Sequence, residues 1–258
     1  MLANYHTHTY LCKHAEGTAR EYIETAISSG LKTLGFSDHV PYPFPADYNS
    51  FIRMDVAQTP EYIKMISDLR EEYKDKIKIY IGYEAEYYPA YFKAMLENIC
   101  QYECDYIILG QHYLNNEIDG AGSGMLTDDK AHLTNYVNQV IEGISTGRFS
   151  YIAHPDMVRY RGDDDFYKKE MTRLCECALD LSVPLEINMN GLYDGRDYPY
   201  VQFWEIAKHV GNGVVIGCDA HRPQMLEKSI HKLGEDYAAS LGIHLQEDIT
   251  LRAVTPLN

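Results

Sequence analysis

Two pairs of residues with a spacing of two lie near opposite ends of this sequence. His6 and His8 form an H-x-H pair near the N-terminus, and Asp219 and His221 repeat the spacing near the C-terminus. In an extended segment every second side chain points to the same face, so the members of each pair point the same way. Imidazoles together with carboxylates are typical ligands of zinc, iron or manganese, whereas calcium and magnesium prefer shells of oxygen. The spacing therefore indicates a transition-metal site.

Further candidate ligands are spread along the chain, and most of them follow short apolar runs. Together with the two pairs they form the set His6, His8, His14, His39, Glu84, His112, His154, Asp219 and His221. One tetrahedral site needs only three or four protein ligands. The set therefore predicts two or three divalent ions (Zn, Fe or Mn), with Glu84 as the natural bridge because its two oxygens can bind different ions. Cys12 lies between His8 and His14, and we expect it to be a buried apolar residue rather than a ligand.

Strands and helices alternate along the chain, which is the pattern of βα units. All but one of the expected strands are followed by a candidate ligand. The carboxyl ends of such strands lie on one side of a barrel or open sheet, where side chains converge. The alternation is compatible with either a barrel or a doubly wound sheet. The expected strands cover Leu2–Tyr5, Thr33–Ser37, Ile77–Ile81, Tyr106–Leu109, Tyr151–Ala153, Pro184–Ile187 and Val214–Ile216.

Helix boundaries are marked by capping residues. Thr18 and Glu21 form a capping-box pattern for a helix that ends at Gly30, and Thr59-Pro60 predicts an N-cap followed by proline at the first helical position. Long loops are expected over 41–58 and 114–128, and the second is either a mobile lid over the site or a plain flexible loop. We expect a single domain over 1–258. Further helices are expected over 90–101, 129–146, 164–181, 201–210 and 223–241.

The composition restricts the class of protein. The 258 residues carry a formal net charge of -15, which would repel the phosphate backbone of an extended nucleic acid. The N-terminal residues lack a signal-peptide pattern, and no apolar run is long enough to cross a membrane. The six cysteines form no C-x-x-C framework. These features predict a cytoplasmic protein that does not bind a membrane.

The order of the candidate ligands resembles the PHP (polymerase and histidinol phosphatase) superfamily, and within it the histidinol-phosphatase branch. The matching segments are Y-H-T-H, C-K-H, S-D-H-V-P, G-Y-E, G-Q-H-Y, A-H-P and C-D-A-H, and they run through nearly the whole chain. The resemblance implies a distorted (β/α)7 barrel with a trinuclear metal centre at the carboxyl ends of the strands.

The resemblance also implies how the ligands divide among three ions. One ion would be held by His6, His8, Glu84 and Asp219, and a second by Glu84, His112 and His154. The third would be held by His14, His39 and His221. His14 would therefore serve a different ion from the first two histidines of the chain.

The activity implied is metal-dependent hydrolysis of a small phosphate monoester, most directly L-histidinol phosphate in histidine biosynthesis. Water that bridges two ions ionises far more readily than bulk water, and the resulting hydroxide could attack phosphorus. We take Glu84, Asp219, His221 and Asp38 as candidate catalytic residues. Asp38 could donate a proton to the leaving group, although we favour a hydrogen bond that orients His39.

Arginine suits bidentate contact with phosphate, so Arg159 is the first candidate for binding the substrate phosphate, followed by Arg161 and Arg53. Two other functions remain open. The first is a phosphoesterase of the same fold that acts on a sugar phosphate, a nucleotide, phosphotyrosine or an oligonucleotide end. The second is a noncatalytic metal-binding domain, which the large number of ligands disfavours.

Overall fold

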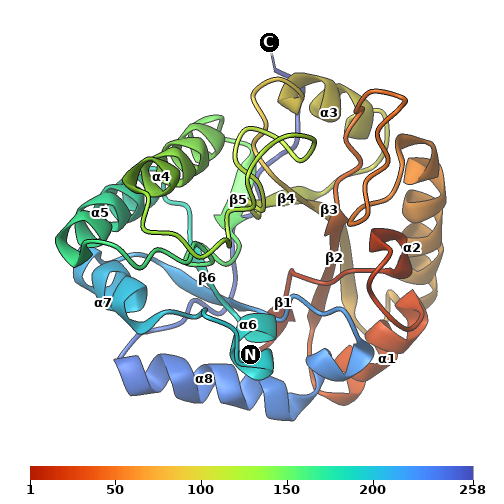
Figure 1. The fold of residues 1–258 in the computed structure, drawn as a ribbon. Coiled ribbons are helices and arrows are strands. Elements are labelled where there is room, and N and C mark those ends of the chain that lie inside the picture. Colours follow the sequence, from red (N-terminus) through yellow and green to blue (C-terminus); the bar gives the residue numbers. More distant parts are fainter. Residues whose placement is uncertain (258) are drawn as a thin grey trace.

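The computed structural model describes residues 1–257, and its strands form one parallel sheet of seven in chain order. Figure 1 looks down the barrel into which this sheet curls. The predicted barrel is confirmed, and all seven expected strands are present. They are β1 (Ala3–Asn4), β2 (Thr33–His39), β3 (Lys78–Ala85), β4 (Tyr106–Leu109), β5 (Phe149–Ile152), β6 (Leu185–Asn188) and β7 (Val214–Gly217).

The barrel is joined between its first and last strands by segments beyond the strand ends. Thr7 and Ala220 form an isolated parallel bridge. The backbone N–H of His8 donates to the carbonyl of Ala220 at 3.0 Å, and the N–H of Ala220 donates to the carbonyl of His6 at 3.2 Å. The connection therefore passes directly through both spaced pairs of candidate ligands, and it brings the two ends of the sequence together.

Helices surround the strands on the outside of the barrel (Figure 1). This arrangement follows from the right-handed crossover that joins consecutive parallel strands. The helices are α1 (Ala19–Ser28), α2 (Thr59–Tyr73), α3 (Phe92–Ile99), α4 (Lys130–Ser145), α5 (Asp164–Asp180), α6 (Met189–Asp194), α7 (Val201–Val210) and α8 (Lys228–Leu241).

Side chains alternate between two layers along each strand. On β4, Ile107 and Leu109 pack in the large apolar layer beneath the helices, while Tyr106 and Ile108 belong to a smaller cluster with residues of other strands. The same period of two places Glu84 and Glu86 of the β3 segment on one face. The inner face of the barrel is therefore apolar near the beginning of the strands and polar at their carboxyl ends.

Several predicted boundaries need correction. Thr59 is the first residue of α2 and Gln58 is its N-cap, because Thr59 already has a helical backbone (φ -50°, ψ -47°). The expected helix over 223–241 is interrupted at Glu227, which has an extended backbone (φ -70°, ψ 150°) between a 3-10 turn and α8. Helix α6 was not expected. The capping box of Thr18 and Glu21 is confirmed.

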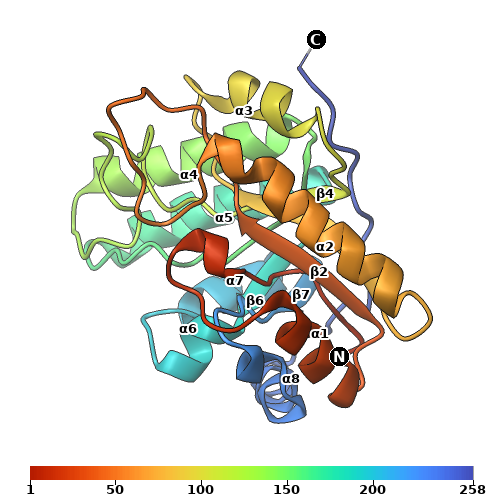
Figure 2. The same cartoon turned by 90° about the vertical axis from the view of Figure 1, so that its right-hand side faces the viewer.

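The two long loops lie at the carboxyl ends of the strands. Figure 2 shows them at one end of the barrel, while the C-terminal segment runs along the opposite end. Loop 114–128 is joined to a later segment by a bridge between Thr127 and Tyr160. Its position beside the barrel opening fits a lid, and its motion stays a prediction. Among the described residues, no helix has the length and apolar character needed to span a membrane.

Candidate metal centre

The carboxyl ends of the strands bring all nine candidate ligands into one cluster. His6 and His8 follow β1, His39 ends β2, and Glu84 lies on β3. His14 reaches the cluster because Lys13, with a left-handed backbone (φ 70°), reverses the chain after a short 3-10 turn. The remaining members, His112, His154, Asp219 and His221, follow β4, β5 and β7.

The first group of donor atoms lies around one Glu84 oxygen. Nε2 of His6 and Nε2 of His8 each lie 3.5 Å from Oε2 of Glu84. Oδ1 of Asp219 lies 3.1 Å from Nε2 of His8 and 3.5 Å from Nε2 of His6. Four donors bound to one zinc ion in a tetrahedral shell lie roughly 3.3–3.6 Å apart, so this group fits a metal ion.

A second group lies around the other Glu84 oxygen. Oε1 of Glu84 is 2.7 Å from Nε2 of His154 and 3.4 Å from Nε2 of His112. Glu84 therefore presents one oxygen to each group, as expected of a bridging carboxylate. A third group consists of His14, His39 and His221, whose donor atoms lie within 4.8 Å of one another.

Several buried nitrogens of these groups lack hydrogen-bond partners, whereas Nε2 of His154 lies 2.7 Å from Oε1 of Glu84. Nε2 of His6 and Nε2 of His8 are enclosed and unpaired, as is Nδ1 of His39. Burying a polar atom without a partner is costly, and a bound cation would remove that cost. The donor types and the unpaired nitrogens therefore both fit the implied metals.

Two carboxylates that were not predicted from the sequence contact histidine rings on the side away from the metal-binding nitrogen. Nδ1 of His6 is 2.8 Å from Glu186, and Nδ1 of His112 is 2.9 Å from Glu86. A carboxylate can only accept here, so each Nδ1 carries the proton and each Nε2 is free to bind metal. Glu186 lies on β6, the strand for which no ligand was found. The signal was available for Glu86, which lies two residues after Glu84.

The backbone beside two of these carboxylates has no room for a side chain. A Cβ at Gly110 would overlap Oε1 of Glu84, and a Cβ at Gly217 would overlap Oε1 of Glu186. Gly110 directly follows β4, and Gly217 is the last residue of β7. The missing side chains leave room for Glu84 to lie over Gly110 and for Glu186 to lie over Gly217 at the carboxyl ends of the strands.

Two candidate ligands have an unusual backbone. His154 has φ 32° and Asp219 has φ 47°, in the left-handed region that non-glycine residues rarely adopt. Such a conformation costs of order 1–3 kcal/mol and is concentrated at functional sites. The strain at both positions is consistent with side chains directed by function rather than by backbone preference.

The charge of the carboxylates is set by the imidazoles around them. Burial alone would raise the pKa of Glu84, but His112, His6 and His39 hold that pKa well below its usual range. Burial is likewise outweighed at Asp219, whose pKa is held low by His6 and by hydrogen bonds from His221 and His8. Both groups are therefore ionised at neutral pH and available to cations.

Asp38 lies behind His8 and not behind the His39 ring. Its carboxylate accepts hydrogen bonds from the backbone N–H of Thr9 and of His39, and Oδ1 is 3.6 Å from Nδ1 of His8. The expected contact with the imidazole of His39 is therefore corrected. Asp38 is fully buried, which places it beneath the cavity rather than in it.

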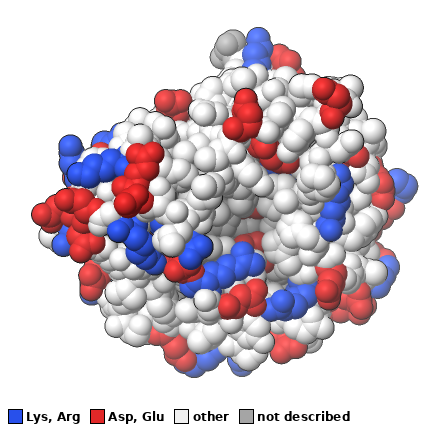
Figure 3. Space-filling view, viewed as in Figure 1, with Lys and Arg blue, Asp and Glu red and all other residues white. Residues whose placement is uncertain are grey.

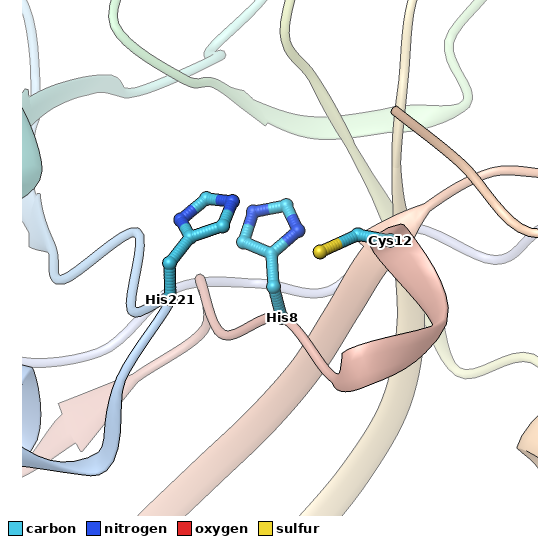
Figure 4. A group of neighbouring side chains, drawn as sticks. All are labelled: His8, Cys12 and His221. Carbon is cyan, nitrogen blue, oxygen red and sulfur yellow. The ribbon is translucent and has the colours of Figure 1, made fainter. Parts of the chain in front are cut away.

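Cys12 also lies close to the cluster, and it is fully buried. Figure 4 shows the His8 ring between the sulfur and the ring of His221. The two imidazoles stack with their centroids 4.0 Å apart. The donor atoms of Cys12, His8 and His221 lie within 4.8 Å of one another, so the expectation that Cys12 is a buried apolar residue rather than a ligand stays a prediction.

A cavity of about 590 Å³ opens above the cluster. In the space-filling view it appears as a hollow at the centre of the face, with basic side chains along its lower edge (Figure 3). Arg196 and Arg222 line it, and both lie near Asp194, at 3.8 Å and 3.0 Å. The rest of the wall includes Ile52, Tyr113, Met125, Met157 and Tyr198.

The arginines expected to bind phosphate lie outside this cavity. Arg159 and Arg161 both pair with Asp197, at 2.6 Å and 3.2 Å, and Arg161 also covers the ring of Tyr200. Arg53 is buried between Glu86 and Glu117. The geometry therefore corrects the assignment of all three, because none of them lines the cavity.

Comparison with known proteins points in one direction. A family model described as the PHP domain matches residues 4–190. A probable histidinol-phosphatase of Deinococcus radiodurans is 30% identical, with 86% of this chain and 87% of that protein aligned. The histidinol-phosphatase of Bacillus subtilis is 29% identical, with 84% and 92% aligned.

The fold has a close match among solved structures. The histidinol phosphate phosphatase of Lactococcus lactis, in complex with zinc, L-histidinol and phosphate, superposes with a TM-score of 0.71 at 21% sequence identity. The match covers 99% of this chain and 98% of that one. It shows that the two chains share the barrel fold.

Proposed function

The chain belongs to the PHP domain family, and we propose from this premise that it is a histidinol-phosphatase. The reaction is hydrolysis of L-histidinol phosphate to L-histidinol and phosphate in histidine biosynthesis. The observation that carries the proposal is the shared carboxylate of Glu84, which presents one oxygen to His6 and His8 and the other to His112 and His154. Relatives that align over most of their length carry the same activity in their names.

The proposed cofactors are two or three divalent ions of zinc, iron or manganese. The ligands are those predicted from the sequence: His6, His8, His14, His39, Glu84, His112, His154, Asp219 and His221. Bound ions would lower the pKa of water and place positive charge beside the phosphoryl oxygens. Zinc in the Lactococcus lactis protein agrees with this choice of metals.

The protein's own residues hold this arrangement in place. Glu84 joins two groups of donors, and Asp219 completes the group around His6 and His8. Glu186 and Glu86 each fix the proton on the outer nitrogen of a histidine, so the inner nitrogen carries a lone pair. We propose that Asp38 supports His8 through its charge, with Oδ1 3.6 Å from Nδ1 of the ring, and that it does not donate a proton to the leaving group because it is buried beneath the ligands.

We propose that Arg196 and Arg222 bind the substrate phosphate. Both line the cavity beside the metal ligands, and the fork of a guanidinium matches two phosphate oxygens. Asp194 holds Arg222 at 3.0 Å, which orders its side chain before substrate arrives. These two arginines replace Arg159, Arg161 and Arg53 in this role.

The remainder of the substrate would lie against the apolar part of the wall. Ile52, Met125 and Met157 offer apolar contacts, and Tyr113 offers an aromatic ring. An imidazole ring suits such surroundings because it packs through its faces and bonds through its edges. A small phosphate ester is thus the proposed partner, and we place the protein in the cytoplasm, away from membranes and extended nucleic acids.

One comparison tests the substrate. The measurement is kcat/KM for histidinol phosphate against a panel that includes sugar phosphates, nucleotides, phosphotyrosine and a phosphodiester. We expect kcat/KM for histidinol phosphate to exceed that for every other ester. If another ester in the panel were the better substrate, the assignment as a phosphoesterase would stand and the assignment to histidine biosynthesis would fall. If metal-loaded protein hydrolysed none of the esters, the result would favour a noncatalytic metal-binding domain.

A further inference from the structure

Arg53 is one of the most deeply buried charged side chains of the chain, with 1% of its surface exposed. Its guanidinium donates to both oxygens of Glu86, at 2.7 Å and 3.1 Å, and to Glu117 at 2.6 Å. It also donates to the backbone carbonyl of Val40 at 3.0 Å. Arg53 therefore connects the ends of β2 and β3 with loop 114–128.

Glu86 links this arginine to the metal centre. Its Oε1 accepts from Arg53 and also lies 2.9 Å from Nδ1 of His112. On the other side of the same ring, Nε2 of His112 lies 3.4 Å from Oε1 of Glu84. The orientation of the ring thus depends on where the Glu86 carboxylate is held.

The fork of arginine is suited to this task. Two parallel N–H groups fix the plane of a carboxylate, whereas a lysine ammonium attracts it as a point charge without setting its orientation. The single positive charge also lies between the carboxylates of Glu86 and Glu117, which would otherwise be buried without a cation. Arginine at position 53 therefore supplies both geometry and charge.

We propose that Arg53 is a positioning residue, which holds Glu86 so that Nε2 of His112 faces the oxygen of Glu84 that the second metal shares. The inference rests on the proposed function only in taking His112 as a metal ligand. It gives Arg53 a role that does not involve contact with substrate. The Glu117 contact is a separate tie between the same guanidinium and loop 114–128.

The test is zinc binding to metal-free protein, measured by competition with a chelator and without any substrate. We expect Arg53→Lys and Arg53→Met to lower the affinity for one zinc equivalent by roughly 10–100-fold, as is usual when the partner of a metal-bound histidine is lost. Arg20→Met is the matched control, because Arg20 also pairs with a carboxylate, Glu72, but on the exposed surface. Circular dichroism checks that each variant is folded, and Arg53→Lys keeps the buried positive charge if Arg53→Met does not fold.

A double-mutant cycle separates positioning from a general structural effect. If Arg53 acts through His112, then Arg53→Lys should weaken zinc binding by less than about twofold in a His112→Ala background. An equal loss in both backgrounds would overturn the proposal, as would wild-type affinity in both Arg53 variants. Glu117→Gln leaves the contact between Arg53 and Glu86 in place, so the zinc affinity of this variant should stay within about twofold of wild type. A loss of affinity as large as that of Arg53→Lys would also refute the mechanism.

The outcome is independent of the substrate. A wild-type protein that binds zinc and shows the expected cycle, but does not hydrolyse histidinol phosphate, would retain the role of Arg53 while the proposed function failed. The opposite result, full phosphatase activity with no coupling between Arg53 and His112, would leave the function and remove the role of Arg53.

Discussion

Nε2 of His14 lies 2.9 Å from Nε2 of His221, although the two residues are 207 positions apart in the sequence. Nδ1 of His14 faces the carbonyl of Cys12 at 2.7 Å, and Nδ1 of His221 faces the carbonyl of Asp219 at 3.0 Å. A carbonyl can only accept, so with neutral rings both protons lie on Nδ1 and two lone pairs face each other. A cation held by both nitrogens would turn this repulsion into attraction.

Removal of metal should therefore abolish activity and destabilise the fold. Dialysis against a chelator is expected to eliminate phosphatase activity and to lower the midpoint of thermal unfolding. An ion present at 1,000 times its dissociation constant contributes about 4 kcal/mol to stability. Readdition of zinc or manganese should restore both properties. Unchanged turnover in protein shown by elemental analysis to be free of metal would contradict the metal-dependent mechanism.

Glu84→Gln should affect two ions at once. The substitution removes the negative charge of the carboxylate and replaces one of its two oxygens with an NH2 group. One group of histidines therefore loses its oxygen ligand, and the other group keeps only a neutral amide oxygen, which binds a cation more weakly. We expect lower metal content in both groups and a fall in kcat/KM of at least about 100-fold, with the fold retained.

His154→Ala provides the comparison for Glu84→Gln. His154 approaches only Oε1 of Glu84, so this variant should lose metal from one group and keep the other. Elemental analysis of the two purified variants distinguishes them. Equal metal content in Glu84→Gln and wild type would argue against a bridging role.

Arg196→Met and Arg222→Met should each weaken substrate binding. Loss of a hydrogen bond to a charged group costs about 1.5–3 kcal/mol, which corresponds to roughly a 10–150-fold increase in KM. Metal content should not change, because neither arginine is a metal ligand. Arg159→Met is the control, since Arg159 pairs with Asp197 outside the cavity. A higher KM for Arg159→Met alone would return that residue to the substrate site.

His231 should make the protein less stable in acid. Burial, followed by the nearby N-terminal ammonium, lowers its pKa to about 4 from an ordinary value of 6.5. A base with a lowered pKa contributes stability above its unfolded pKa, and the contribution is lost as the pH falls from about 6.5 toward 4.

His231→Phe isolates this effect, because Nε2 of His231 has no hydrogen-bond partner to lose. Between pH 7.5 and pH 4.5 the free energy of unfolding of wild type should fall by about 2.5 kcal/mol more than that of the variant. Denaturant unfolding at both pH values, with chelator present throughout, measures the difference. Parallel pH profiles would show that His231 does not titrate in this range.

Local sequence patterns were sufficient for the strands and for choosing the candidate ligands. Short apolar runs predicted all seven strands, because buried parallel strands need apolar side chains on both faces. The spacing of His6 with His8 and of Asp219 with His221 placed each pair on one face, since side chains repeat every two residues in an extended chain. Parallel strands end on one side, and this rule alone predicted that the ligands meet.

Other features required contacts between distant segments. Alternation of strand and helix left a barrel and an open sheet equally open, and the family resemblance pointed to the barrel. Closure depends on Thr7 and Ala220, which lie at opposite ends of the chain. Helix α6 was missed because it is short and begins directly after β6, where Asn188 caps it.

The roles of the arginines were decided only in three dimensions. Arg53, Arg159 and Arg161 suggested phosphate contact by residue type, but each is paired with a carboxylate whose position depends on how separate loops pack. Arg196 and Arg222 reach the cavity because α6 and the connection after β7 bring them to its edge. Residue type and local spacing thus determined which side chains can do the chemistry, while the partner of each long charged side chain depended on the tertiary structure, because a flexible side chain pairs with whichever opposite charge the fold brings within reach.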